Sequence, residues 1–269
     1  MLFTLNCLGA KKEKDRKLDN QYNSRISSTL TTLRADYTIS RGFSLDLAMP
    51  VAVLFTSVTR NNKVVETAQF GLSDLTSMLH YNFTSLYSNK ERWPALQVGL
   101  GMSFPTGKGM VRLEGDAGTQ LSVGSGTFDL LAQLLLSWQP VSRVALFLSS
   151  QLQQPLHAAK MLTLGTSFQC GLGAYWQVWA KKMGLQLSVE SEYTATAIEE
   201  QEGQSPMQNS GGFSLFVAPA WSIVLTRGLL LQLRGRIPVY QYVNGVQLVP
   251  QFAISTSLSY TFSSFASKK

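Results

Sequence analysis

The chain contains two histidines, His80 and His157, and the histidine imidazole is the most common general base in enzymes. A hydrolytic site would also need a nucleophile within hydrogen-bond reach of one of them. Neither histidine has a serine partner at a recognisable spacing. His80 falls on the polar positions of an alternating segment, and His157 is expected in a loop between Pro155 and Lys160. We therefore expect no catalytic residue.

The remaining motifs that could bind a metal or cofactor are incomplete. Cys7 and Cys170 form neither a CxxC pair nor a haem-attachment motif. The stretch PTGKG, which starts at Pro105, resembles part of a phosphate-binding loop, but it lacks the GxxxxGK[ST] spacing and no helical pattern follows it. The sequence predicts no metal and no cofactor.

The net charge of +7 does not indicate nucleic-acid binding. Lys and Arg bind nucleic acid when they gather on one face, whereas here they lie in Lys11–Lys17, in short turns and at Lys268–Lys269. The first ten residues, MLFTLNCLGA, show no signal-peptide pattern, since no basic residue precedes their apolar run.

The pattern that extends over nearly the whole chain is a two-residue alternation, which is typical of strands. In QFAISTSLSYTF, Phe252, Ile254, Leu258, Tyr260 and Phe262 alternate with small or polar residues. Similar segments run for about 10 to 15 residues, longer than the usual 5 or 6 of soluble strands and long enough to cross a bilayer when tilted. No apolar stretch approaches the roughly 18 to 20 residues of a transmembrane helix.

Short turns alternate with longer polar connections along the chain, as in transmembrane barrels. Among the longer connections we expect Thr59–Gly71, Pro105–Gly126 and Gln241–Gln247. Eleven strands are clear, and a short segment at Leu2–Leu8 brings the number to twelve, the even number that bacterial barrels require. The prediction is all-β, a transmembrane antiparallel up-and-down β-barrel of about 12 strands. A soluble β-sandwich is the alternative fold. Residues 1–24 would hold the first strand and a polar, basic loop, residues 25–262 the barrel and residues 263–269 a polar tail.

The polar positions of these strands would face the lumen and the apolar ones the lipid bilayer, their expected partner. The candidates for the lumen are Arg34, Asp36, Asp46, Asp74, His80, Asp129, Gln133, Glu190, Glu192, Gln232, Arg234 and Arg236. Both signs of charge occur, so the lumen is expected to be either a wet pore or an interior crossed by ion pairs, because isolated buried charge is very costly. The aromatic residues expected at the lipid interface are Phe43, Trp138, Trp176, Trp221, Tyr260 and Phe262.

Three segments together resemble a known family. FGLSDL at Phe70–Leu75, RWPALQVGLGMSFPTGK at Arg92–Lys108 and VGSGTFDLLAQLLLSW at Val123–Trp138 are similar, in order and spacing, to the outer-membrane transporter family of the meta-pathway of phenol degradation. The resemblance implies a bacterial outer-membrane barrel that passes hydrophobic or aromatic compounds. On physical grounds, Gly107, Gly124 and Gly126 supply backbone freedom, while Asp74 and Asp129 either cap loop amides or pair with a lumen arginine.

The sequence is consistent with three functions. The leading hypothesis is a passive channel or uptake barrel in the bacterial outer membrane for small-molecule solutes. The alternative is a structural barrel that anchors an envelope protein partner and transports nothing. The third and least favoured is a membrane-embedded lipid hydrolase, because His80 falls on a lumen-facing position of its strand and would point away from the bilayer.

Overall fold

The structure is a computed structural model of the 269-residue chain. It describes residues 2–5, 9–14, 16–17, 24–40, 42–60, 63–86, 94–107, 111–112, 120–121, 124–158, 162–178, 182–199, 205–206, 210–226 and 228–261. Within these residues, no helix is both long and apolar enough to cross a membrane.

Nearly all of the described chain is strand, in one large sheet. Its main strands are β1 (Leu2–Leu5), β4 (Ser24–Thr38), β5 (Phe43–Arg60), β7 (Leu75–Asn82), β8 (Ala95–Phe104), β11 (Thr127–Val141), β12 (Val144–Ala158), β14 (Ser167–Val178), β15 (Met183–Thr194), β18 (Gly212–Thr226), β19 (Leu229–Pro250) and β20 (Ala253–Tyr260). Shorter elements are β2 (Gly9–Lys14), β3 (Arg16–Lys17), β6 (Lys63–Leu72), η1 (Phe83–Leu86), β9 (Val111–Arg112), β10 (Gln120–Leu121), β13 (Leu162–Thr163), β16 (Ile198–Glu199) and β17 (Ser205–Pro206).

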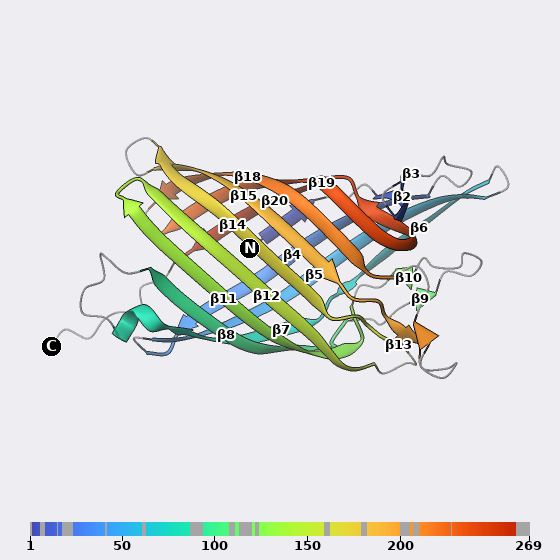
Figure 1. Cartoon of the computed structure of the whole chain (residues 1–269), viewed down its shortest axis with the longest axis horizontal. Coiled ribbons are helices and arrows are strands. Elements are labelled where there is room, and N and C mark those ends of the chain that lie inside the picture. The colour runs from blue at the N-terminus through green and yellow to red at the C-terminus, as the bar shows by residue number, and fades with distance from the viewer. Residues whose placement is uncertain are drawn as a thin grey trace.

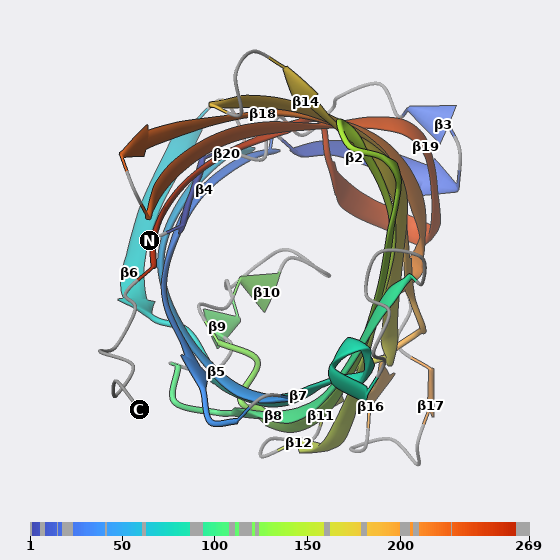
Figure 2. The same cartoon turned by 90° about the vertical axis from the view of Figure 1, so that its left-hand side faces the viewer.

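The sheet closes on itself as an antiparallel up-and-down barrel. Of its 15 strands in the described residues, β2, β3 and β6 lie off the ring, and the other twelve form it. Each ring strand pairs with the ring strands that come before and after it along the chain. β18 pairs with β19, and β1 pairs with both β20 and β4, so the sheet returns to its start. The end-on view shows this ring directly (Figure 2). Closure gives the strands of the barrel wall partners on both sides, the condition for crossing lipid as strands.

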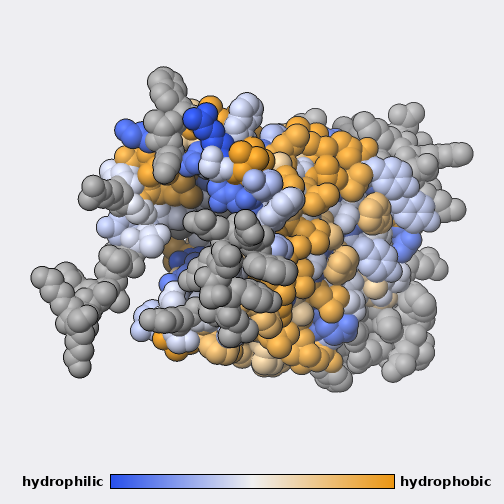
Figure 3. All heavy atoms as spheres, turned by 60° about the vertical axis from the view of Figure 1, so that its left-hand side comes forward, coloured by the Kyte–Doolittle hydropathy of each residue, from blue (hydrophilic) through white to orange (hydrophobic). Residues whose placement is uncertain are grey.

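The outer face of the barrel is apolar because every second residue of each strand points outward. Leu100, Leu172 and Trp176 are 65%, 63% and 57% exposed, which is unusual for such large side chains in water. Hydrophobic residues cover much of the outer wall in the middle of the space-filling view, with more polar residues toward its two ends (Figure 3). This banding is typical of a barrel whose middle lies in lipid.

The two ends of the barrel differ. Tight connections join β11 to β12 and β18 to β19 at one end, where η1 also lies, and most of the longer segments gather at the other end, which we call the loop end (Figure 1). The short strands β9 and β10 lie at the loop end in the side view and inside the outline of the ring in the end-on view (Figure 1, Figure 2). β9 and β10 therefore cover part of the mouth.

Several stretches predicted as loops contain strands, including β2 and β3 in the basic loop expected in residues 1–24 and β9 and β10 in Pro105–Gly126. Most of Thr59–Gly71 belongs to β5 and β6, whose hairpin pairs Val51–Arg60 with Lys63–Leu72. Gln241–Gln247 lies within β19, and the backbone of His157 lies in β12, opposite Phe128. These stretches are rich in polar residues and lack the apolar alternation by which strands are recognised, so the sequence pattern misses them.

A β-bulge changes the direction of side chains in β19. The pairing shifts between Leu215 and Phe216, so that Phe216 faces Pro238 while Leu215 faces Tyr240. One extra residue reverses the in-and-out alternation beyond it. Tyr240 is accordingly 49% exposed on the outer wall, with its ring centroid 6.2 Å from that of Phe213. Simple alternation from Leu229 predicts an inward Tyr240, which is wrong for this reason.

Candidate functional site: the inner face of the barrel

The first group of charges on the inner face lies on β4 and β5. Asp36 pairs directly with Asp46 in the sheet register, and the Arg34 guanidinium lies beside both. Arg34 Nε donates a hydrogen bond to Asp46 Oδ2 and lies 3.6 Å from Asp36 Oδ1. The Asp46 side chain is only 6% exposed, whereas those of Arg34 and Asp36 are 53% and 65% exposed. The inner face is thus accessible to solvent beside a buried, paired carboxylate.

His80 lies near this group on β7, but it has no catalytic partner among the residues that the structure describes. It is 5% exposed and packs against the neighbouring strand, where a Cβ on Gly99 would lie 2.6 Å from His80 Nδ1. Its Nε2 has no hydrogen-bond partner in the described part of the chain. The side chain of His157 lies outside the described residues. No described serine, threonine or cysteine is hydrogen-bonded to His80, so the geometry offers no activated nucleophile.

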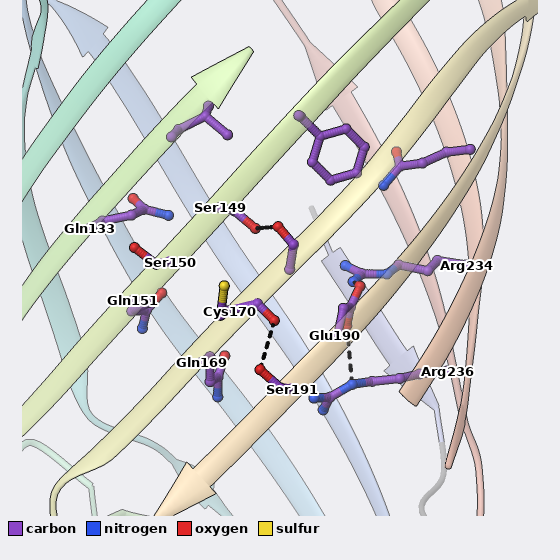
Figure 4. Close-up of a pocket in the computed structure, with 14 residues that line it drawn as sticks. Gln133, Ser149, Ser150, Gln151, Gln169, Cys170, Glu190, Ser191, Arg234 and Arg236 are labelled. Carbon is purple, nitrogen blue, oxygen red and sulfur yellow. Dashed lines mark hydrogen bonds and ion pairs between the residues drawn. The ribbon is translucent and has the colours of Figure 1, made fainter. Parts of the chain in front are cut away.

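The second group of charges joins β15 to β19 across the intervening β18. Arg234 Nη2 donates to Glu190 Oε1, and Arg236 Nη2 donates to Glu192 Oε2 at 2.8 Å. Arg236 Nε also lies 3.2 Å from Glu190 Oε2, which places Glu190 between the two guanidinium groups (Figure 4). Two positive and two negative charges therefore neutralise one another at this wall.

An aromatic ring holds the second group in place. The Arg236 guanidinium carbon lies 3.8 Å from the ring centroid of Phe216, which is 2% exposed. This is a close cation–π contact. Ser188 Oγ adds a 2.9 Å hydrogen bond to Glu190 Oε1. Phe216 lies on the inner face because β18 alternates, but an isolated phenylalanine in an apolar strand gives no sign of this role in the sequence.

A cavity of about 280 Å³ lies between the second charge group and β11, β12 and β14. Gln133, Gln151 and Gln169 line it from these three adjacent strands (Figure 4). Gln186 of β15 also lines it. No described residue forms a hydrogen bond to any of the four amides. Only Gln133 is among the residues predicted from sequence, because the lateral register that aligns the others is not visible in the chain order.

Asp74 and the backbone N–H groups of Gly107 and Ser125 form a hydrogen-bonded cluster at the loop end, which we call the latch. Asp74, only 7% exposed, accepts hydrogen bonds from the backbone N–H groups of Gly107 at 3.1 Å and Ser125 at 2.5 Å. A Cβ on Gly107 would lie 2.8 Å from the Cα of Gly124, so the two backbone segments can come this close because both residues are glycine. Thr106 Oγ1 accepts from Leu75 N at 2.9 Å. Of the two roles considered for Asp74, the geometry is that of a loop cap.

Asp129 is also enclosed in the wall and unavailable to a solute. It is fully buried, with Thr127 Oγ1 at 2.5 Å from Oδ1 and Gln153 Nε2 at 2.6 Å from Oδ2. The three segments that carry the family resemblance therefore meet around Asp74 and Asp129. Both carboxylates are fixed by hydrogen bonds, so neither presents a free oxygen to the lumen.

The remaining predicted residues have clear positions. Gln232 of β19 pairs with Ser222 and Ser257 on the inward positions. Phe43, Trp138, Trp176, Trp221 and Tyr260 are all exposed on outward positions. Phe43, Trp138, Trp176 and Tyr260 lie within a few residues of the short turns. Phe262 lies outside the described residues.

The closed ring, the apolar outer face and the charged inner face define a β-barrel of the outer-membrane type. The fold is similar to an outer membrane channel from Pseudomonas putida F1, with a TM-score of 0.72 over 97% of this chain and 93% of that chain at 11% identity. It also resembles the NanC porin, with a TM-score of 0.51 over 97% of this chain and all of that chain at 7% identity. No protein-family model and no curated protein matches the sequence.

Proposed function

We propose that this protein is a bacterial outer-membrane channel through which small solutes diffuse passively. The observation that carries the proposal is a closed ring with accessible charged and amide side chains on its inner face, such as the 65% exposed Asp36. Twelve strands enclose a wider interior than the eight-stranded barrels that side chains fill. Polar inner residues that keep contact with solvent favour a wet pore over a packed interior.

The likeness to a channel and a porin supports this proposal at the level of fold. Membership of the phenol meta-pathway family is a further part of it, supported by the meeting of the three motif segments at the latch of Asp74, Gly107 and Ser125. That family implies hydrophobic or aromatic solutes. The polar inner face favours those solutes that also form hydrogen bonds.

The experiment is single-channel recording in planar bilayers with refolded protein whose gel migration shifts on heating, the sign of a folded barrel. We expect stable conductance steps in KCl and solute entry into liposomes. A structural barrel for an envelope partner would insert and shift on heating, yet never conduct. Folded, inserted protein without conductance would therefore refute the channel.

A further inference from the structure

The glutamines of the cavity form a ladder across the inner wall. In the sheet register Gln133 lies directly opposite Gln151, and Gln151 directly opposite Gln169. The next partner in the same row is Glu192, the acceptor of Arg236. Directly opposed residues on neighbouring strands repeat at about 4.8 Å. Three amides therefore follow one another at a regular spacing and end at the second charge group.

The amides of this ladder have no hydrogen-bond partner among the described residues and can bind a ligand. Each carries an acceptor oxygen and two N–H donors, and within the described chain no residue is hydrogen-bonded to the amides of Gln133, Gln151 or Gln169. All three line the cavity of about 280 Å³. A solute there would find alternating donors and acceptors along one wall.

The charge of the cavity selects against ions. Arg234 and Arg236 are paired with Glu190 and Glu192, so the group is neutral as a whole. An anion would meet two carboxylates and a cation two guanidinium groups. Phe147 and Leu135 add apolar surface to the same cavity.

We propose that the ladder of Gln133, Gln151 and Gln169 is a binding site for small neutral solutes that carry several hydroxyl groups, such as sugars and polyols. A hydroxyl both donates and accepts, as an amide does, so it can use either end of each glutamine. The C–H surface of such a solute suits Phe147 and Leu135. This inference rests on the proposed channel function, and it puts neutral polyhydroxylated solutes in place of the hydrophobic or aromatic solutes that the family resemblance implies.

The test is the current through single channels as sucrose, sodium gluconate or triethylene glycol is added to one side. Sucrose is neutral and rich in hydroxyls, gluconate is charged, and triethylene glycol is neutral with few hydroxyls. We expect saturable block and excess current noise with sucrose alone. Each amide lost should weaken the affinity for sucrose about fivefold, which corresponds to the loss of one neutral hydrogen bond.

The variants are Gln133→Ala, Gln151→Ala and Gln169→Ala, singly and combined, with Gln232→Ala as the matched control on the inner face away from the ladder. The combined variant should lose saturable block, while Gln232→Ala keeps it within about twofold. Heat-shifted gel migration establishes that each variant is folded. If the channel conducts but sucrose block is absent, the solute class is wrong; if the block is unchanged in the combined variant, the ladder is not the binding site. The channel stands in both cases. If folded wild type does not conduct, both proposals fail.

Discussion

Removal of the Asp74 carboxylate is the most demanding test of the latch at the loop end. The carboxylate is 7% exposed and accepts from two backbone N–H groups, those of Gly107 at 3.1 Å and Ser125 at 2.5 Å. A hydrogen bond to a charged group contributes about 1.5 to 3 kcal/mol. Asp74→Ala removes both and leaves two donors without an acceptor, so we expect a loss of about 3 to 5 kcal/mol in the free energy of unfolding. Asp74→Asn keeps one acceptor and should lose about half as much.

The assay is reversible urea unfolding of the barrel in phospholipid vesicles, followed by tryptophan fluorescence. Asp36→Ala is the matched control, because the Asp36 side chain is 65% exposed and its ion pair with Arg34 spans 3.6 Å; a change below about 1 kcal/mol is expected there. Gly107 and Ser125 anchor both ends of the segment that carries β9 and β10 over the mouth, so Asp74→Ala should also give noisier channel currents. Equal stabilities of Asp74→Ala and Asp36→Ala would refute the latch.

Two further predictions concern packing and charge. A Cβ on Gly173 would overlap Phe147 Cζ and lie 2.8 Å from the Leu187 carbonyl oxygen, so Gly173→Ala should lower the free energy of unfolding in urea by about 1 to 3 kcal/mol. At the control position, Gly235, the nearest atom to an added Cβ lies at 3.8 Å, so Gly235→Ala should change the free energy of unfolding by less than about 0.5 kcal/mol. Equal losses in the two variants would contradict the close approach at Gly173. Glu190→Gln leaves two arginines with one carboxylate, so the cation-to-anion permeability ratio from reversal potentials should fall about twofold while Glu190→Asp keeps it. An unchanged ratio in Glu190→Gln would place Glu190 outside the ion pathway.

The sequence predicted the barrel because alternation depends only on local residue types. The long alternating segments, with apolar residues such as Leu100 and Trp176 on one face, predicted a barrel, and the closed sheet confirms that fold. The requirement for an even number of strands predicted the twelfth strand near Leu2, which pairs with β20 and β4.

The site was less accessible to sequence reasoning because it depends on register between strands. Gln133, Gln151 and Gln169 are 18 residues apart in each step, and only the lateral pairing makes them neighbours. The bulge that turns Tyr240 outward adds one residue that no local pattern marks. The contact between Gly107 and Gly124 likewise arises from closure of a long connection, not from either motif alone.

The most direct test of the channel assignment is modification of a single inner-face cysteine during recording. In a chain with Cys7→Ser and Cys170→Ser, Gln151→Cys introduces a thiol on the cavity wall and Leu152→Cys one on the outer face, where Leu152 is 41% exposed. A charged, membrane-impermeant methanethiosulfonate should lower the conductance of Gln151→Cys in one step and leave that of Leu152→Cys unchanged. The opposite result, with Leu152→Cys modified and Gln151→Cys unaffected, would contradict a water-filled lumen bounded by this face of the sheet.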